Sequence, residues 1–213
     1  MMQIKTKVKK ILNLLDLHYP VDAKCYLYHE KPYELLFATI LSAQCTDDRV
    51  NTITETLFKK YPSLAAFAAA EPEELERDIF SAGFYTVKAR HIIGSANMLI
   101  DEFDGEVPAD IDKLTRLPGV GRKTANLILG HVYGLPAIVV DTHVKRISNK
   151  LGLTGAEDPE KIEYALMKIL PQDHWIRYNT QIIAHGRTVC TAKNPACNAC
   201  FLNNLCDFNF KKP

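Results

Sequence analysis

Four cysteines near the C-terminal end of the 213-residue sequence restrict its fold more than any other feature. They are Cys190, Cys197, Cys200 and Cys206, with the spacing C-x6-C-x2-C-x5-C. Such a set supplies the four soft ligands that a tetrahedral zinc ion or an iron-sulfur cluster requires. The lack of histidine and the irregular gaps favour iron-sulfur and leave zinc open. Because the segment is rich in asparagine and has little apolar material, we expect a metal centre to order it.

The other cysteines and the N-terminal segment predict an intracellular protein. Asp16 and His18 interrupt the first apolar run, which therefore indicates an amphipathic helix and not a signal peptide. In a reducing compartment thiols stay free, so Cys25 and Cys45 are expected to be ordinary buried thiols. No apolar run approaches the roughly 20 residues of a membrane span. We expect a soluble, cytoplasmic protein.

Apolar residues recur at helical spacing along most of the chain, which predicts an all-α fold. Residues 137–140 alone resemble a strand, and because they have no evident partner strand we interpret them as an extended or helical connector. The predicted helices contain Ile4–Leu15, Leu35–Leu41, Val50–Leu57, Ala89–Leu99, Ala125–Val132, Val144–Leu151 and Ile162–Leu170.

Charge is balanced overall but not locally. The net charge of +1 gives the chain no general attraction to nucleic acid or to an anionic membrane. An acidic run at residues 71–78 is interpreted as a solvated helix face. Between Arg116 and Lys150, in contrast, six basic residues accompany a single acidic one, Asp141. This stretch is the candidate for a polyanion site.

A glycine-containing turn lies within the basic stretch, in the sequence LTRLPGVGRKTANLILGHV from Leu114 to Val132. Gly119 and Gly121 can take positive φ and leave backbone N–H groups accessible at the start of the next helix. Such amides suit a DNA phosphate and read no base. A plain interhelical turn would have the same sequence features, so the hairpin alone leaves both interpretations open.

Lys123 and Asp141 are the candidates for chemistry. Lys123 falls in the first turn of the helix after the hairpin, beside Arg122, where the helix dipole favours loss of its proton. A neutral lysine amine is a nucleophile, although a phosphate contact would suit the same position. Asp141 precedes another helix directly, so it is either a helix N-cap or a carboxylate that accepts the lysine proton, and the first role does not exclude the second.

Taken together, these motifs resemble the endonuclease III group of the helix-hairpin-helix DNA glycosylase superfamily over nearly the whole chain. The resemblance rests on the following segments, of which LPGVGRKTAN followed by VDTH and the cysteine spacing is highly specific: LLFATILSAQCTD (Leu35–Asp47), GFYTVKA (Gly83–Ala89), LPGVGRKTAN (Leu117–Asn126), VDTHV (Val140–Val144), HGR (His185–Arg187) and the cysteines ending at Cys206.

The resemblance implies a two-lobed, all-α fold. A six-helix barrel would cover residues 21–134 and contain the helix-hairpin-helix motif at about 114–132. Residues 1–20 and 135–213 would form a discontinuous domain, with a cluster loop at 190–206 that binds a 4Fe-4S cluster. The cluster would be structural or redox-sensing and not catalytic.

The implied activity is base excision repair of damaged or abasic double-stranded DNA by a nucleoid-associated monomer. Lys123 would attack C1′ of the sugar, expel an oxidised pyrimidine and form a Schiff base, from which β-elimination cuts the strand. Asp141 would deprotonate Lys123 and stabilise the developing positive charge.

The resemblance also implies residues that contact DNA. Gln44 and Phe84 match positions that fill the gap left by the extruded base. Many members carry leucine in the second of these loops, where this chain has Phe84 followed by Tyr85, and this departure bears on opposite-base preference. His143 is interpreted as structural or DNA-contacting and not as catalytic. The remaining implied contacts are Gly119, Val120, Gly121, Arg122 and Lys193.

Two other classes of protein share part of this pattern. A monofunctional adenine glycosylase of the MutY type shares the hairpin, the aspartate and the cluster, but it normally lacks the lysine and has a further C-terminal domain. This sequence has Lys123 and ends shortly after Cys206. In a non-catalytic iron-sulfur DNA-binding protein, Lys123 and Asp141 would be only a phosphate contact and a helix cap.

Overall fold

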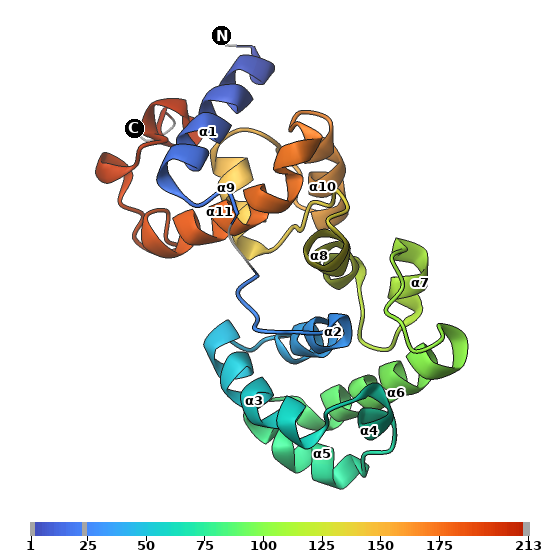
Figure 1. Cartoon of the computed structure of the whole chain (residues 1–213). Coiled ribbons are helices and arrows are strands. Elements are labelled where there is room, and N and C mark those ends of the chain that lie inside the picture. Colours follow the sequence, from blue (N-terminus) through green and yellow to red (C-terminus); the bar gives the residue numbers. More distant parts are fainter. Residues whose placement is uncertain (1–2, 23–24, 211–213) are drawn as a thin grey trace. The chain divides into compact units, whose positions relative to one another are not determined.

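The computed structural model describes residues 3–22 and 25–210, and within these ranges every regular element is a helix (Figure 1). The prediction of an all-α fold is confirmed. Residues 137–140 form a connector that is neither helix nor strand. The helices are α1 (Ile4–His18), α2 (Pro32–Leu41), α3 (Asp47–Lys60), α4 (Leu64–Ala68), α5 (Pro72–Asp78), η1 (Phe80–Ala82), α6 (Tyr85–Glu102), α7 (Ile111–Arg116), α8 (Arg122–Tyr133), α9 (Thr142–Lys150), α10 (Pro159–Met167), η2 (Gln172–His174), α11 (Trp175–Thr188), η3 (Cys197–Ala199), η4 (Asn203–Leu205) and α12 (Asp207–Phe210).

The chain divides into two compact units. Unit 1 comprises Met1–Lys24 and Leu135–Pro213, and unit 2 comprises Cys25–Gly134. Unit 2 ends at Gly134, which caps α8 with a φ of 62°, in the left-handed region that glycine adopts without strain. The assignment of a six-helix barrel to residues 21–134 and of a cluster domain to residues 1–20 and 135–213 stays a prediction. No helix in the part of the chain that the structure describes is long and apolar enough to cross a membrane.

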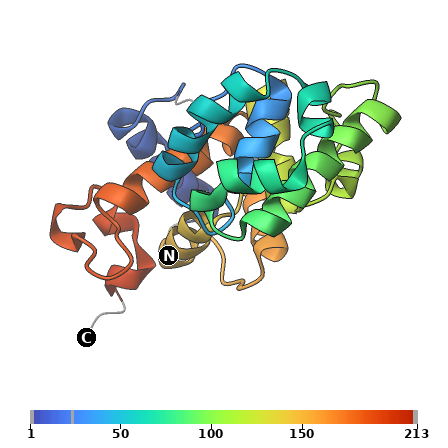
Figure 2. The ribbon, with the colours of Figure 1, turned by 90° about the horizontal axis from the view of Figure 1, so that it is seen from below.

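Unit 2 is built around α2, whose residues from Glu34 to Leu41 are all buried. A helix that is apolar on nearly every side must be covered on nearly every side. α2 contacts α3, α6 and α8, and Figure 2 shows it among them. The buried Glu34 carboxylate accepts hydrogen bonds from the N–H groups of Glu30 (2.8 Å) and Lys31 (3.0 Å), which satisfies the start of the helix.

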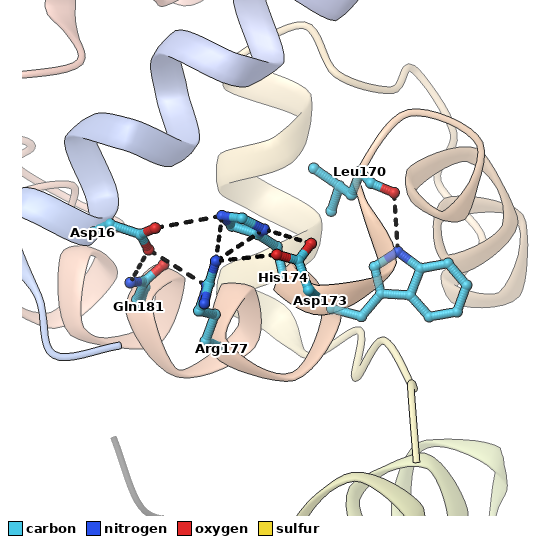
Figure 3. A network of polar contacts seen from close by, with 7 residues as sticks. Asp16, Leu170, Asp173, His174, Arg177 and Gln181 are labelled. Carbon is cyan, nitrogen blue, oxygen red and sulfur yellow. Dashed lines mark hydrogen bonds and ion pairs between the residues drawn. The ribbon is translucent and has the colours of Figure 1, made fainter. Parts of the chain in front are cut away.

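Unit 1 joins the N-terminal helix to the C-terminal half of the chain. The apolar face of α1 packs into a core shared with α9, α10 and α11. A polar network adds to this packing, and Figure 3 shows its side chains gathered around Asp16. The Asp16 carboxylate accepts a hydrogen bond from Gln181 Nε2 (2.9 Å) and lies 3.3 Å from His174 Nε2 and 3.5 Å from Arg177 Nε. These contacts fix the end of α1 to α11.

Helix α11 is the longest helix that the spacing of apolar residues in the sequence does not predict. Its buried residues include Asn179, Thr180, Gln181 and His185 as well as Tyr178, so apolar residues alone do not mark its buried face. The polar side chains have partners instead: Asn179 Nδ2, for example, donates to the carbonyl of Val139 (3.0 Å). α4 is also absent from the predicted helices, and α10 ends at Met167 before the predicted Leu170.

Candidate functional site

The hairpin between α7 and α8 in unit 2 is a tight turn at Leu117–Gly121. Gly119 has a φ of 77°, and a Cβ placed there would lie 2.5 Å from His91 Nδ1, so both the backbone and the close approach require glycine. Gly121 has a φ of −95°, which any residue can adopt. Of the two glycines that can take positive φ, only Gly119 does so, because the chain is already extended at Gly121 as the N-cap of α8. Val120 is buried beneath the turn.

α6 supports the hairpin from within unit 2. Ser95 Oγ donates a hydrogen bond to the carbonyl of Pro118 (2.9 Å), and His91 packs against Gly119. A Cβ on Gly94 would lie 3.2 Å from Pro118 Cγ, so the α6 surface is close to the turn. The conformation of the hairpin is therefore set by packing against a long helix as well as by its own glycines.

Lys123 is the second residue of α8 and its side chain is exposed. Ala125 and Ile128 on the opposite side of the helix are fully buried, which directs Lys123 and its neighbours outward. The first N–H groups of a helix have no acceptor within it, so the turn that carries Arg122 and Lys123 presents amide groups beside two cationic side chains. The arrangement can bind an anion and expose an amine to it.

Asp141 is the N-cap of α9 in unit 1. Its carboxylate Oδ1 accepts a hydrogen bond from the N–H of Val144 (2.7 Å), and the side chain is half-buried. The interpretation of Asp141 as an N-cap is confirmed. A capping carboxylate keeps lone pairs that can accept a proton from another group. Lys123 belongs to unit 2 and Asp141 to unit 1.

Gln44 and Phe84, the predicted inserting residues, share an unusual backbone conformation. Their φ angles are 55° and 49°, in the left-handed region that non-glycine residues rarely occupy. Both side chains are exposed, and Phe84 is 65% accessible. Tyr85, which follows Phe84, is half-buried and its ring packs 4.8 Å from that of Phe80. Of these two aromatic residues, Phe84 is thus the one whose ring is mostly exposed.

All four cysteines of the C-terminal set line one hollow in unit 1, and their side chains are half-buried free thiols. Its empty volume, part of it open to solvent, is about 420 Å³. Burial raises the pKa of the Cys200 thiol, and the other three cysteines add to this shift. The hollow is otherwise lined mainly by apolar residues, among them Ile147, Leu151, Val189, Pro195, Leu202 and Phe208.

This donor set fits an iron-sulfur cluster. Four thiolates are the usual ligands of a 4Fe-4S cluster, and an apolar shell around a cluster limits access of water. The cysteines would bind iron as thiolates, and the positive charge of the iron would offset the repulsion between them. Among the described residues no group of three or more His, Cys, Asp or Glu side chains is arranged to hold a single metal ion.

Hydrogen bonds from two neighbouring helices hold the cysteine loop. Arg146 Nη1 donates to the carbonyl of Cys190 (2.7 Å), and the Cys206 thiol donates to the carbonyl of Lys150 (3.3 Å). The Nε2 atom of His185 lies 3.6 Å from the sulfur of Cys200. Burial, together with Arg146 and His18, lowers the pKa of His185 to about 4, so this histidine is neutral.

The remaining predicted residues have distinct surroundings. His143 is half-buried, its Nδ1 atom lies 3.1 Å from Arg146 Nη2, and it packs so closely on Gly186 that a Cβ there would come within 2.3 Å. Those contacts are structural, and its contact with DNA stays a prediction. Lys193 is exposed on the loop between Cys190 and Cys197.

Cys25 and Cys45 are half-buried and not buried as predicted. Cys45 follows the exposed Gln44 in the turn after α2, where the chain leaves the core. Neither Lys88 nor His185 is assigned a role from the sequence alone. Lys88 lies within the motif GFYTVKA and His185 within HGR, but only their burial in the folded chain distinguishes them from surface residues.

Comparison with known proteins agrees with this site. The family model of the HhH-GPD superfamily of base excision DNA repair proteins matches residues 37–172, and that of the iron-sulfur binding domain of endonuclease III matches residues 190–206. Endonuclease III of Synechocystis sp. is 49% identical over 203 residues, which cover 95% of this chain and 92% of that protein.

Two solved structures are similar over nearly the whole chain. They are a non-covalent endonuclease III–DNA complex and a trapped endonuclease III–DNA covalent intermediate. Each has a TM-score of 0.92 and 45% sequence identity and covers 99% of this chain. The match covers 98% of the first structure's chain and 99% of the second's.

Proposed function

The chain belongs to the endonuclease III family of the HhH-GPD superfamily, and we propose that it removes oxidised pyrimidines from double-stranded DNA and then cleaves the abasic strand. It is thus a DNA glycosylase and an abasic-site lyase. The observation that carries the proposal is the exposed Lys123 in the first turn of α8, directly after the hairpin that is bent at Gly119.

Base extrusion comes first, because the glycosidic carbon of a stacked base is inaccessible to a side chain. The hairpin amides, with Arg122 and Lys193, hold phosphates without reading sequence. Gln44 and Phe84 enter the gap that the base leaves, where an aromatic ring replaces lost stacking. His143 belongs to the same DNA-facing set.

Lys123 Nζ then attacks C1′ of the extruded nucleotide. The C1′–N bond breaks, the electron pair leaves with the base, and the sugar ring opens to a Schiff base between C1′ and Nζ. Loss of a C2′ proton is followed by breakage of the C3′–O bond, which cuts the strand on the 3′ side. Asp141 accepts the proton that Lys123 must lose before attack, and its negative charge stabilises the positive charge that develops on the sugar.

The cofactor is a 4Fe-4S cluster bound by the four cysteines of the hollow. When bound, it supplies a fixed centre that orders the C-terminal loop, and the excision chemistry uses none of its electrons. Lys193 lies on this loop, so ordering the loop also places a cation for a phosphate. We further propose that the protein acts as a monomer on nucleoid DNA.

Borohydride trapping on a duplex with one abasic site tests the nucleophile. Borohydride reduces a Schiff base to a stable amine, so the wild type becomes covalently attached to DNA. Lys123→Ala is expected to form no adduct. Lys59→Ala is the matched control, because Lys59 is exposed on α3 and its side chain pairs with the nearby Glu55 (3.6 Å). An adduct that persists in Lys123→Ala overturns the nucleophile assignment.

Asp141→Asn separates the chemical role from the cap. Asparagine caps a helix about as well as aspartate, so the variant is expected to keep its stability. Without the carboxylate, the excision rate is expected to fall by about 10²–10⁴-fold. Asp158→Asn is the control, since Asp158 caps α10 through the N–H of Lys161 (3.0 Å). Equal activity of the two variants would leave Asp141 as a cap only.

A further inference from the structure

Lys88 on α6 is a buried cation that the proposed chemistry does not use. Its side chain is 3% exposed, and Nζ donates hydrogen bonds to the carbonyls of Leu41 (2.8 Å) and Ala82 (2.9 Å). Burial lowers the pKa of this lysine. A buried ammonium group is unfavourable unless its donors are satisfied, so these two bonds are a specific arrangement and not an incidental surface contact.

The two carbonyls belong to the two segments that carry the proposed inserting residues. Leu41 is the last residue of α2, and the turn that follows contains Gln44. Ala82 ends η1 and is followed by Gly83 and Phe84. A single side chain therefore bonds to the chain just before each of the two proposed inserting residues. The position at the end of α2 also suits a cation, because the last carbonyls of a helix carry partial negative charge.

Strain in both turns explains why such a contact is useful. Non-glycine residues in the left-handed region are unfavourable and persist only where the surroundings hold them. Two short loops that each carry one such residue would otherwise relax independently. Both insertions fill the same gap in DNA, so they must occur at a fixed separation.

We propose that Lys88 is a positioning residue that holds the Gln44 turn and the Phe84 turn together, so that both side chains are ready to enter the duplex. The inference rests on the proposed function of Gln44 and Phe84 as inserting residues. Because both turns are already ordered in the free protein, they need not become ordered during DNA binding, and base extrusion is faster. α6 extends the effect, because His91 and Ser95 on the same helix contact the hairpin at Gly119 and Pro118.

Lys88→Met tests this role, because methionine keeps much of the apolar volume and removes all donors. The measurements are single-turnover excision of an oxidised pyrimidine from a duplex and fluorescence of 2-aminopurine as a reporter of extrusion. The rate of excision and the rate of base extrusion are both expected to fall by about ten- to a hundredfold, as when a reacting group is misplaced by a small distance. Lys59→Met, which removes an exposed cation from α3, is expected to match the wild type.

A double-mutant cycle distinguishes positioning from general support of the fold. In a Gln44→Ala, Phe84→Ala background, Lys88→Met should cause no further loss, since there are no inserting side chains to position. If Lys88→Met lowers the rate by the same factor in both backgrounds, the inference is overturned. If Gln44→Ala with Phe84→Ala leaves extrusion unchanged, the inserting role itself is wrong, and the inference falls with it.

Lys88→Gln keeps the experiment decisive if Lys88→Met does not fold. The shorter amide can donate to one of the two carbonyls, so extrusion is expected to be slower than in the wild type. Thermal unfolding checks that each variant is folded before its rate is compared. A folded Lys88→Gln with wild-type extrusion overturns the proposal.

Discussion

In unit 2 the hairpin and the two strained turns rest on an apolar core that contains the fully buried Phe37 and Phe67, whereas in unit 1 the cysteine loop surrounds a hollow. α2, buried from Glu34 to Leu41, gives unit 2 a centre made by the chain itself. The cysteine loop has short 3-10 turns and a few polar bonds to α9 and α11. The difference indicates that unit 2 is ordered by packing and the end of unit 1 by its cofactor.

Loss of a cluster ligand should have the largest effect and should be confined to unit 1. In Cys200→Ser we expect loss of the broad visible absorbance and faster amide hydrogen exchange in the cysteine loop, because metal binding contributes on the order of 10 kcal/mol to small metal-dependent folds. The control is Cys25→Ser in unit 2, whose half-buried thiol should be dispensable. Wild-type protection of the loop without a cluster would contradict the comparison.

A substitution that creates a cavity in the core of unit 2 should destabilise that unit and leave the cluster of unit 1 in place. Phe37 is fully buried and its ring lies 4.8 Å from that of Phe67. Phe37→Ala should reduce the free energy of unfolding of unit 2 by about 3–5 kcal/mol. The visible absorbance should persist under native conditions. Phe80→Ala, at a position that is 62% exposed, loses the ring contact with Tyr85 and should change stability by about 1 kcal/mol or less. Loss of the cluster in Phe37→Ala would show that the two units are not ordered separately.

The hairpin glycines should give a smaller effect that differs between them. Gly119→Ala puts a side chain at a φ of 77° and against His91, so it should destabilise unit 2 by about 1–3 kcal/mol and weaken DNA binding. Gly121 has a φ of −95° and open space around it, and Gly121→Ala should leave the unfolding temperature nearly unchanged. Equal destabilisation by both substitutions would show that the positive φ of Gly119 does not determine the stability of the hairpin.

The sequence predicted those parts of the fold that depend on one side of a helix being apolar. It predicted the helices α1, α3 and α6, because their buried residues recur at helical spacing. It did not predict α11, whose buried face holds Asn179, Gln181 and His185. Their burial depends on partners far along the chain, such as Asp16, and no local pattern reveals such a partner.

The candidate site divides in the same way. The cysteine spacing and the PGVG turn are local, so the metal site and the hairpin could be predicted directly. Gly119 and Gly121 look equivalent in sequence and differ in the structure, because only Gly119 is pressed against His91. The contact of Lys88 with Leu41 and Ala82 joins residues from separate segments, and its significance follows only from the fold.

Titration of His131 should give the smallest effect and sharpen the comparison within unit 2. Burial, with a smaller contribution from His29, lowers the pKa of His131 below its usual value of 6.5. As the pH falls through 6.5, the unfolded chain binds this proton before the folded unit does. The free energy of unfolding of unit 2 therefore decreases on the acid side and is fully recovered above the unfolded pKa.

His131→Gln removes a half-buried titrating group from a unit that otherwise depends on apolar packing. Amide hydrogen exchange in unit 2, compared at about pH 7.5 and about pH 5.5 after correction for intrinsic rates, should show less loss of protection in the variant than in the wild type. An identical pH dependence in both proteins would mean that groups other than His131 carry the acid sensitivity of unit 2. The stability of unit 2 would then depend on other charged groups as well as on its apolar core.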